Sequence, residues 1–259
     1  MKQKWLILSG VILCVWSCTR TQPSGSSSAE SSDMTPVTDS LEARIEALNE
    51  EMEGYISEYE SRPSEETLRR AMALNDSLER IDTTAQGHFN TLLTRSQLLM
   101  KAGRVKEAMR LQESLLSKDP DNVVRLQFYT GKYFLEERAD SMLYYGQRAL
   151  AVCDKELAEN EGDLEAREQS LINKLTIYQL LNDRMHAREV TNQLQSLQQL
   201  AGARVMSDDE FNAEFDEARE ELNKLAVAWR NDTDDGSKEP SATVNGETHK
   251  QVAPTKEKE

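Results

Sequence analysis

Apolar residues recur at steps of three and four from about residue 38 to residue 230, and this periodicity constrains the fold more than any other feature of the chain. Such spacing places apolar side chains along one face of an α-helix, whereas a half-buried strand alternates at every second residue. Pro63 and Pro120 are the only prolines in the region, so few positions interrupt a helix. We therefore predict an all-α region of about nine helices.

The N-terminal segment has the pattern of an export signal. Lys2 and Lys4 precede an apolar run, Trp5 to Trp16, which is too short to remain as a membrane-spanning helix. The run ends in Val15-Trp16-Ser17-Cys18, which resembles the lipobox of bacterial lipoproteins. The resemblance implies a signal peptide over residues 1–17 and lipidation of Cys18. Cys14 is a competing site, and an ordinary secretory signal without a lipid is the alternative.

Segments of low apolar content flank the helical region. Residues 18–37 are rich in Ser, Thr, Pro and Gly, and residues 231–259 have the same character without a periodic apolar pattern. Neither segment has enough apolar side chains to bury a core. We expect a flexible tether over 18–37, a folded solenoid over 38–230 and a disordered tail over 231–259.

The chain is acidic, with a net charge of −15 over 259 residues. This charge disfavours nucleic acid and anionic lipid surfaces as partners, so membrane contact is expected through the lipid anchor only. Once Cys18 is acylated, Cys153 keeps the only free thiol and an intramolecular disulfide cannot form. Cys153 lies beside Val152 on an apolar helix face, which favours a buried core residue over a reactive thiol.

A repeat pattern begins at Phe89. Leu92, Leu99, Gly103, Ala108 and Pro120 stand at the helix, turn, small-residue and closing positions of a helix pair that ends at Asn122. This segment, 89–122, resembles a tetratricopeptide repeat over its full period. Gly103 would permit the left-handed turn between the helices, and Ala108 would let them approach closely. Ser96 and Gln112 depart from the pattern, since the family has Gly or Ala at the first position and an aromatic residue at the second.

Further pairs follow the first repeat. Residues 123–156 resemble a second repeat in which Glu137 replaces the turn glycine, and after an insertion at about 157–167 a weaker pair occupies 168–200. The segment 207–229 begins with Ser207 and Glu210, a capping-box pair, and its apolar face predicts a capping helix. The helix expected over 41–61 is interpreted as a second cap, with a dimerising coiled coil as the alternative; the oligomeric state stays open.

Residue combinations typical of catalysis or metal binding are not found in the sequence. His88, His186 and His249 are far apart and lack a Cys or His at ligand spacing, and no phosphate-binding glycine loop occurs. Runs of carboxylates on amphipathic helices are usually solvated faces. The sequence therefore favours a binding protein without cofactor or metal over an enzyme.

The resemblance places a partner surface on the first helix of each pair, because in tetratricopeptide proteins exposed positions of these helices line the concave face. It carries over to Asn90, Leu93, Gln97 and Lys101 in the first repeat, to Val124, Gln127, Gly131, Phe134 and Leu135 in the second, and to Gln169, Ile172, Thr176 and Leu180 in the third. This mixture of side chains suits a protein or peptide with apolar anchors. The alternative is that Leu93, Val124 and Ile172 pack between neighbouring helices.

Two expectations concern modification and location. Asp39-Ser40-Leu41 resembles an O-glycosylation sequence of exported Bacteroidota proteins, which makes Ser40 a candidate site; helix capping is the alternative. Thr19 after the lipidated cysteine implies an outer-membrane lipoprotein, and the neutral stretch that follows implies that it faces the periplasm. A scaffold or adaptor is the function expected, and an assembly factor for outer-membrane barrels, secretins or pili is the alternative.

Overall fold

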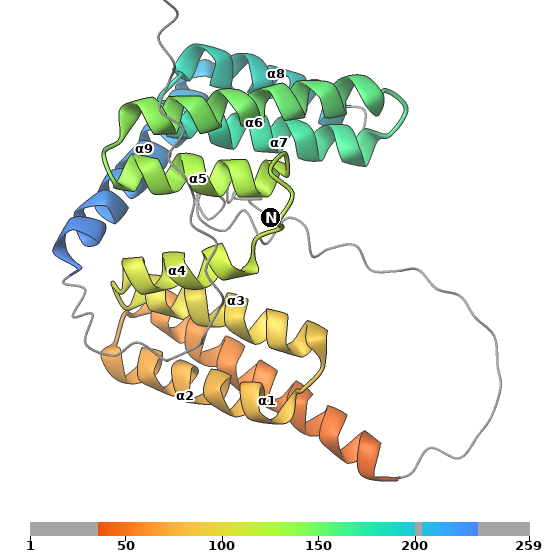
Figure 1. The fold of residues 1–259 in the computed structure, drawn as a ribbon, viewed down its shortest axis with the longest axis vertical. Helices are drawn as coiled ribbons and strands as arrows, with labels where there is room; N and C mark the ends of the chain where they lie inside the picture. The colour runs from red at the N-terminus through yellow and green to blue at the C-terminus, as the bar shows by residue number, and fades with distance from the viewer. Residues whose placement is uncertain (1–35, 200–203, 233–259) are drawn as a thin grey trace, which may run out of the picture.

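The computed structural model describes residues 36–199 and 204–232, and within these ranges the chain forms nine helices and no strand (Figure 1). The all-α prediction is confirmed. The helices are α1 (Pro36–Ser61), α2 (Glu65–Ile81), α3 (Ala85–Lys101), α4 (Val105–Leu115), α5 (Val123–Leu135), α6 (Ala139–Glu159), α7 (Leu164–Leu180), α8 (Arg184–Gln199) and α9 (Asp208–Asn231).

Consecutive helices pack as antiparallel pairs, α1 with α2, α3 with α4, α5 with α6 and α7 with α8. Contacts of α2 with α3 and of α6 with α7 join the pairs into two groups, α1–α4 and α5–α8 (Figure 1). The chain passes from one group to the other between α4 and α5. This is a helical-repeat-like arrangement, and α9 is its last described element.

The left-handed turn expected at Gly103 recurs in the later pairs. Gly103 has φ 74°, Glu137 has φ 57° and Asn182 has φ 58°. At each turn the next residue's N–H donates to a carbonyl five residues back, as Arg104 does to Leu99 over 2.9 Å. Ala108 and Leu99 are fully buried, as the repeat pattern predicts. The same turn therefore closes all three pairs from α3 to α8.

Side-chain caps begin several of the helices. Ser64 accepts a hydrogen bond from Thr67 N–H at the start of α2, and Ser207 forms the expected capping box with Glu210 at the start of α9. Thr84, Asn122 and Asp163 cap α3, α5 and α7 in the same way. The predicted start at Ser207 is confirmed.

Some predicted boundaries were wrong. α1 begins at Pro36, so the expected tether over 18–37 overlaps the helix, and α9 continues to Asn231. The residues expected as an insertion at about 157–167 form the end of α6, which runs to Glu159, a short turn, and the start of α7 at Leu164. The physical reason is Leu157, which packs against the apolar cluster of α7, α8 and α9, so that α6 gains a buried contact by continuing.

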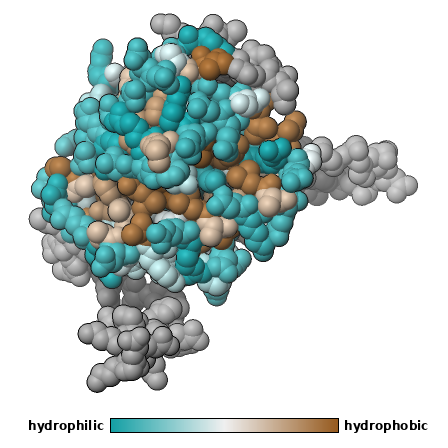
Figure 2. Space-filling model, turned by 90° about the horizontal axis from the view of Figure 1, so that it is seen from above, coloured by the Kyte–Doolittle hydropathy of each residue, from teal (hydrophilic) through white to brown (hydrophobic). Residues whose placement is uncertain are grey.

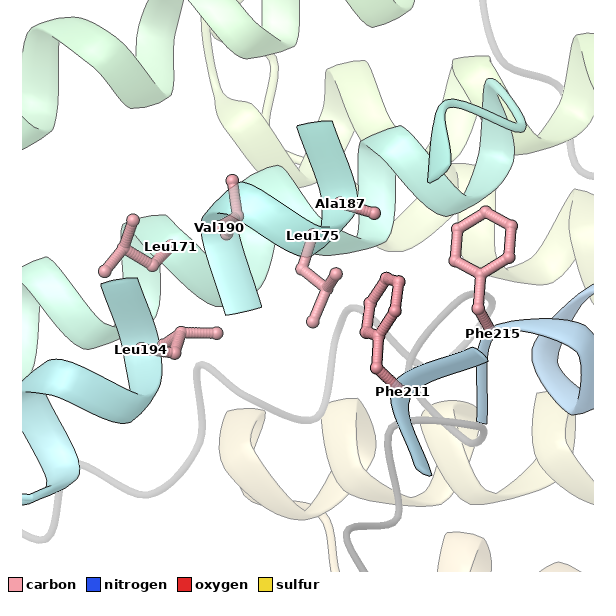
Figure 3. Packing of buried hydrophobic residues seen from close by; sticks show 7 residues of the cluster. All are labelled: Leu171, Leu175, Ala187, Val190, Leu194, Phe211 and Phe215. Carbon is pink, nitrogen blue, oxygen red and sulfur yellow. The ribbon is translucent and has the colours of Figure 1, made fainter. Parts of the chain in front are cut away.

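The capping helix covers the last helix pair, as expected. Figure 3 shows Phe211 and Phe215 of α9 directed toward apolar side chains of α7 and α8. The other members of this buried cluster are Leu171, Leu175, Ala187, Val190 and Leu194. At the opposite end, the apolar face of α1 packs against α2. Met52 is buried in this contact, and Leu48 and Tyr55 are partly buried. This packing favours the cap interpretation of α1 over the coiled coil.

Cys153 is fully buried in α6, as predicted. Burial raises the pKa of its thiol to about 12, because the thiolate would lose its hydration in the core. Cys18 and the other residues of the signal segment and tether before Pro36 lie outside the described residues.

Candidate functional site

The structure distributes the predicted partner-binding residues over different environments. Asn90 is exposed, and six others are half-buried: Gln97, Lys101, Val124, Phe134, Gln169 and Ile172. The remaining six are buried: Leu93, Gln127, Gly131, Leu135, Thr176 and Leu180. A continuous concave groove through all of these positions is therefore not formed.

The prediction was wrong for the six buried positions. For those in α5 and α7 the reason is that these two helices, the first of successive pairs, pack on each other. Gln127 of α5 is only 1% exposed, and its Nε2 donates to the carbonyl of Asn173 in α7 over 3.0 Å. Thr176 donates its hydroxyl to the carbonyl of Ile172 within α7. Leu93 belongs to the core, as the alternative interpretation held. Contacts between α5 and α7 leave no space for a partner at these positions.

Five of the six half-buried positions also make contacts within the chain: Val124, Ile172, Lys101, Gln169 and Phe134. Val124 and Ile172 pack against the apolar clusters of their own helix pairs. Lys101 Nζ lies 2.8 Å from a carboxylate oxygen of Glu60, and the Lys101 carbonyl accepts a hydrogen bond from Tyr59. Gln169 Nε2 donates to Asn173 Oδ1 over 3.3 Å. Lys101, which was predicted to contact a partner protein, thus joins α3 to the end of α1.

Phe134 is covered by α9. Beyond Phe215 this helix crosses the end of α7 toward α5, and Leu222 packs with Leu180 and Phe134. Farther along, Leu225, Ala226, Ala228 and Trp229 pack against Val105, Met109, Phe128 and Leu135. We call the surface beneath this part of the helix the α9 seat; it consists of Val105, Lys106 and Met109 of α4, Phe128, Phe134 and Leu135 of α5, and Gln179 and Leu180 of α7.

One end of the α9 seat binds a cation. The guanidinium of Arg219 donates to the carbonyls of Gln179 and Leu180 over 3.0 and 3.2 Å. These carbonyls belong to the last turn of α7, where the helix dipole is negative, and the Gln179 carbonyl also accepts from the backbone N–H of Asn182 over 3.2 Å. The same guanidinium lies 5.3 Å from the centre of the Phe134 ring. Burial at this position lowers the pKa of Arg219.

The other end of the α9 seat binds a carboxylate. Arg104 occupies the cap position of α4 and makes no side-chain cap. Asp232 supplies one instead, because its Oδ2 accepts from the backbone N–H of Lys106 over 2.8 Å. In return, Lys106 Nζ donates to the Asp232 carbonyl over 2.7 Å and lies 5.7 Å from the Trp229 ring centre. The start of α4 and the end of α9 therefore cap each other.

Exposed apolar side chains alone do not single out a site. Seen from the α8 side, apolar side chains form a band across a mainly hydrophilic surface (Figure 2). The large exposed ones are spread over several helices: Leu41, Leu143, Tyr144, Leu164, Met185, Val205 and Val227. Two basic side chains of α3 and α5 are paired within the chain, Arg95 with Asp76 and Lys132 with Glu113.

The described part of the chain holds no cluster of three or more metal-ligating side chains. It also has no helix long and apolar enough to cross a membrane. Comparison with protein-family models, with curated proteins and with solved structures gave no match. We therefore take the α9 seat as the candidate functional site, on the basis of its apolar contacts and the polar contact at each end.

Sequence reasoning missed the α9 seat, although two signals for it were present. One is the missing cap at Arg104, where Ser, Thr, Asp or Asn would be usual. The other is the length of the last helix, whose apolar positions continue to Trp229, beyond what is needed to cover one helix pair. Neither signal says which distant helix end lies beside Asp232.

Proposed function

We propose that this protein is a lipid-anchored interaction scaffold that binds a partner protein or peptide on a tetratricopeptide-like stack of helix pairs. The observation that carries the proposal is the α9 seat. It accepts an amphipathic helix across the ends of α4, α5 and α7, with apolar side chains in the middle and a polar contact at each end. These are the elements of helix-in-groove recognition.

The proposed anchor is the lipid on Cys18, and the proposed location is the periplasmic face of the outer membrane. A tether between the lipid and the helical stack would keep the stack near that membrane and raise the effective concentration of any partner there. The proposed role is binding, and catalysis by the chain itself is not part of it.

Cross-linking and affinity purification of the full-length tagged protein from its own cells test this proposal. We expect a defined protein partner that is recovered reproducibly, and that is absent when an unrelated lipoprotein of similar abundance carries the tag. Enrichment of barrel, secretin or pilus subunits would assign the scaffold to assembly. Recovery of nothing beyond the control would contradict a scaffold role.

The anchor is tested separately with Cys18→Ser. We expect this variant to lose labelled palmitate and to leave the membrane fraction, with Cys14→Ser as the matched control that keeps both. A Cys18→Ser protein that still incorporates palmitate would show that the lipid lies elsewhere.

A further inference from the structure

We propose that the α9 seat is the partner-binding site, that its ligand is an amphipathic helix of the partner, and that residues 219–232 compete with that helix from within the chain. We call residues 219–232 the latch. The inference rests on the proposed function and deepens it, because it names the chemistry of the ligand and a means of regulating its access.

The first half of α9 is firmly attached, and it can hold the helix in place while the latch exchanges. Phe211 and Phe215 are 5% and 1% exposed. Arg188 and Arg184 of α8 lie over these two rings, at 5.1 and 4.8 Å from their centres, and also pair with Asp208 and Asp216. The capping box at Ser207 closes the start of the helix.

The latch is held less tightly than the first half. Leu222 is 4% exposed, but Leu225, Ala226, Ala228 and Trp229 are only partly buried, and Val227 is 46% exposed. Its polar contacts lie at the two ends, through Arg219 and Asp232, together with an exposed pair between Arg230 and Glu137. A helix end with few deeply buried side chains opens locally at a lower free-energy cost than a core helix.

An empty α9 seat would expose a contiguous apolar surface formed by Val105, Met109, Phe128, Phe134 and Leu135. Such a surface is unfavourable in water, so opening of the latch favours replacement by a ligand of the same chemistry. The occupant is therefore an amphipathic helix, because that is the shape and polarity the seat already accommodates.

The two ends of the seat set the direction and length of this helix. Carbonyls at the end of α7 favour a cation at the start of the ligand helix. The first turn of α4, which its own residue Arg104 does not cap, favours a carboxylate at the end of that helix. Arg219 and Asp232 are separated by about 20 Å of helix at 1.5 Å per residue. The predicted ligand order is thus a cation, an apolar stripe equivalent to Leu222 and Trp229, and a carboxylate.

A fluorescent peptide with the sequence of residues 216–232 is the probe for this inference. Trp229→Ala in the full-length protein should loosen the latch, and we expect it to bind the peptide at least tenfold more tightly than the unmodified chain does. Val227→Ala is the matched control in the same helix, and should bind as the unmodified chain does, because Val227 faces solvent. The milder Asp232→Ala serves as a second loosened variant if Trp229→Ala does not fold.

Direction is tested with a second peptide in which Arg219 is replaced by Glu. It should bind the loosened variants at least tenfold more weakly, because a carboxylate would face the last carbonyls of α7. Equal binding of both peptides, or equal binding to loosened and unmodified chains, would overturn the inference. So would a loosened variant that dimerises and takes up no peptide, since a second copy would then be the occupant.

The partner recovered from cells separates this inference from the proposed function. Excess of the 216–232 peptide should release the partner from the purified complex, and the peptide with Glu in place of Arg219 should not. A partner that stays bound at saturating peptide would leave the scaffold function standing and would exclude the α9 seat as its site.

Discussion

Ser96 and Gln112 are the two residues at which the first repeat departs from the tetratricopeptide pattern, and the structure places them together. Both are buried, and Gln112 Nε2 donates to Ser96 Oγ over 3.3 Å. Ser96 in turn donates to the carbonyl of Leu93 over 2.7 Å. The hydroxyl across the helix pair thus satisfies the Nε2 of the amide that replaces the aromatic residue, whereas the Oε1 of Gln112 is buried without a hydrogen-bond partner.

This hydrogen bond predicts that substitutions of Ser96 and Gln112 have non-additive effects on the unfolding free energy. Ser96→Ala should cost about 1–3 kcal/mol of unfolding free energy, because it leaves the buried Gln112 amide without an acceptor. Gln112→Leu in the Ser96→Ala background should recover most of that loss, since no polar group then remains unpaired. Urea denaturation of both single variants and the double variant gives the coupling free energy. Strictly additive changes would show that the two side chains act independently.

Ala108 has no exposed surface at the contact between α3 and α4. Ala108→Leu should therefore overpack this contact and lower the unfolding free energy by about 1–3 kcal/mol. Ala151→Leu is the matched control, because Ala151 is exposed in α6 and the larger side chain meets solvent. If the two variants melt at the same temperature, the small-residue position of the repeat has been assigned to the wrong residue.

Among the elements, the turns show what local sequence can and cannot specify. Gly103 was predicted in the left-handed conformation, and the position equivalent to it in the second pair, Glu137, has the same conformation although it has a side chain. The turn is thus imposed by the packing of α5 against α6 and not by the residue type. Asn182 at the third turn is a residue that adopts this conformation more readily.

Strain at the second turn predicts that Glu137→Gly stabilises the protein by up to about 1 kcal/mol, because glycine adopts a positive φ without the Cβ contact. The exposed pair with Arg230 is lost, but such pairs contribute little. Glu136→Gly is the control, and should destabilise, since Glu136 is in the ordinary helical region. Differential scanning calorimetry compares the three chains, and a lower melting temperature for Glu137→Gly would contradict the strain argument.

The helices could be predicted from the sequence because the features that determine them are local. Apolar spacing and side-chain caps such as Ser64 and Ser207 lie within a few residues of the element they define. The partner surface did not follow, because the burial of Gln127 and Thr176 depends on how closely α5 and α7 approach. That distance is set by packing between pairs, which periodicity within one helix does not encode.

At the scale of the whole molecule, α9 connects the two groups of helices. Its first half covers α7 and α8, and its second half contacts α5 and α4. Contacts made directly between α4 and α5 include the hydrogen bond from Tyr129 to Glu113 over 3.0 Å. In the described part of the chain, α9 therefore supplies part of the contact between α1–α4 and α5–α8. The apolar periodicity of the sequence does not predict this contact.

Truncation after Ala218 tests this dependence. The shortened chain keeps Phe211 and Phe215 and should still cover the last helix pair, but it loses the contacts with α4. We expect α1–α4 to unfold at a lower temperature than α5–α8, so that the single transition of the chain ending at Asp232 separates into two. Calorimetry and hydrogen exchange of α4 amides report this directly. One transition at an unchanged midpoint would show that the groups are joined by other contacts.

The cap that Asp232 supplies to α4 also imposes an order in time. The donor and acceptor are 126 positions apart in the chain, so a nascent polypeptide has made all of α4 long before the carboxylate exists. During synthesis, the first turn of α4 has only water to satisfy its N–H groups, and the apolar side chains that later meet Trp229 stay uncovered. A chain whose translation stops early thus has an unfinished surface in its middle, where a chaperone or protease can recognise it.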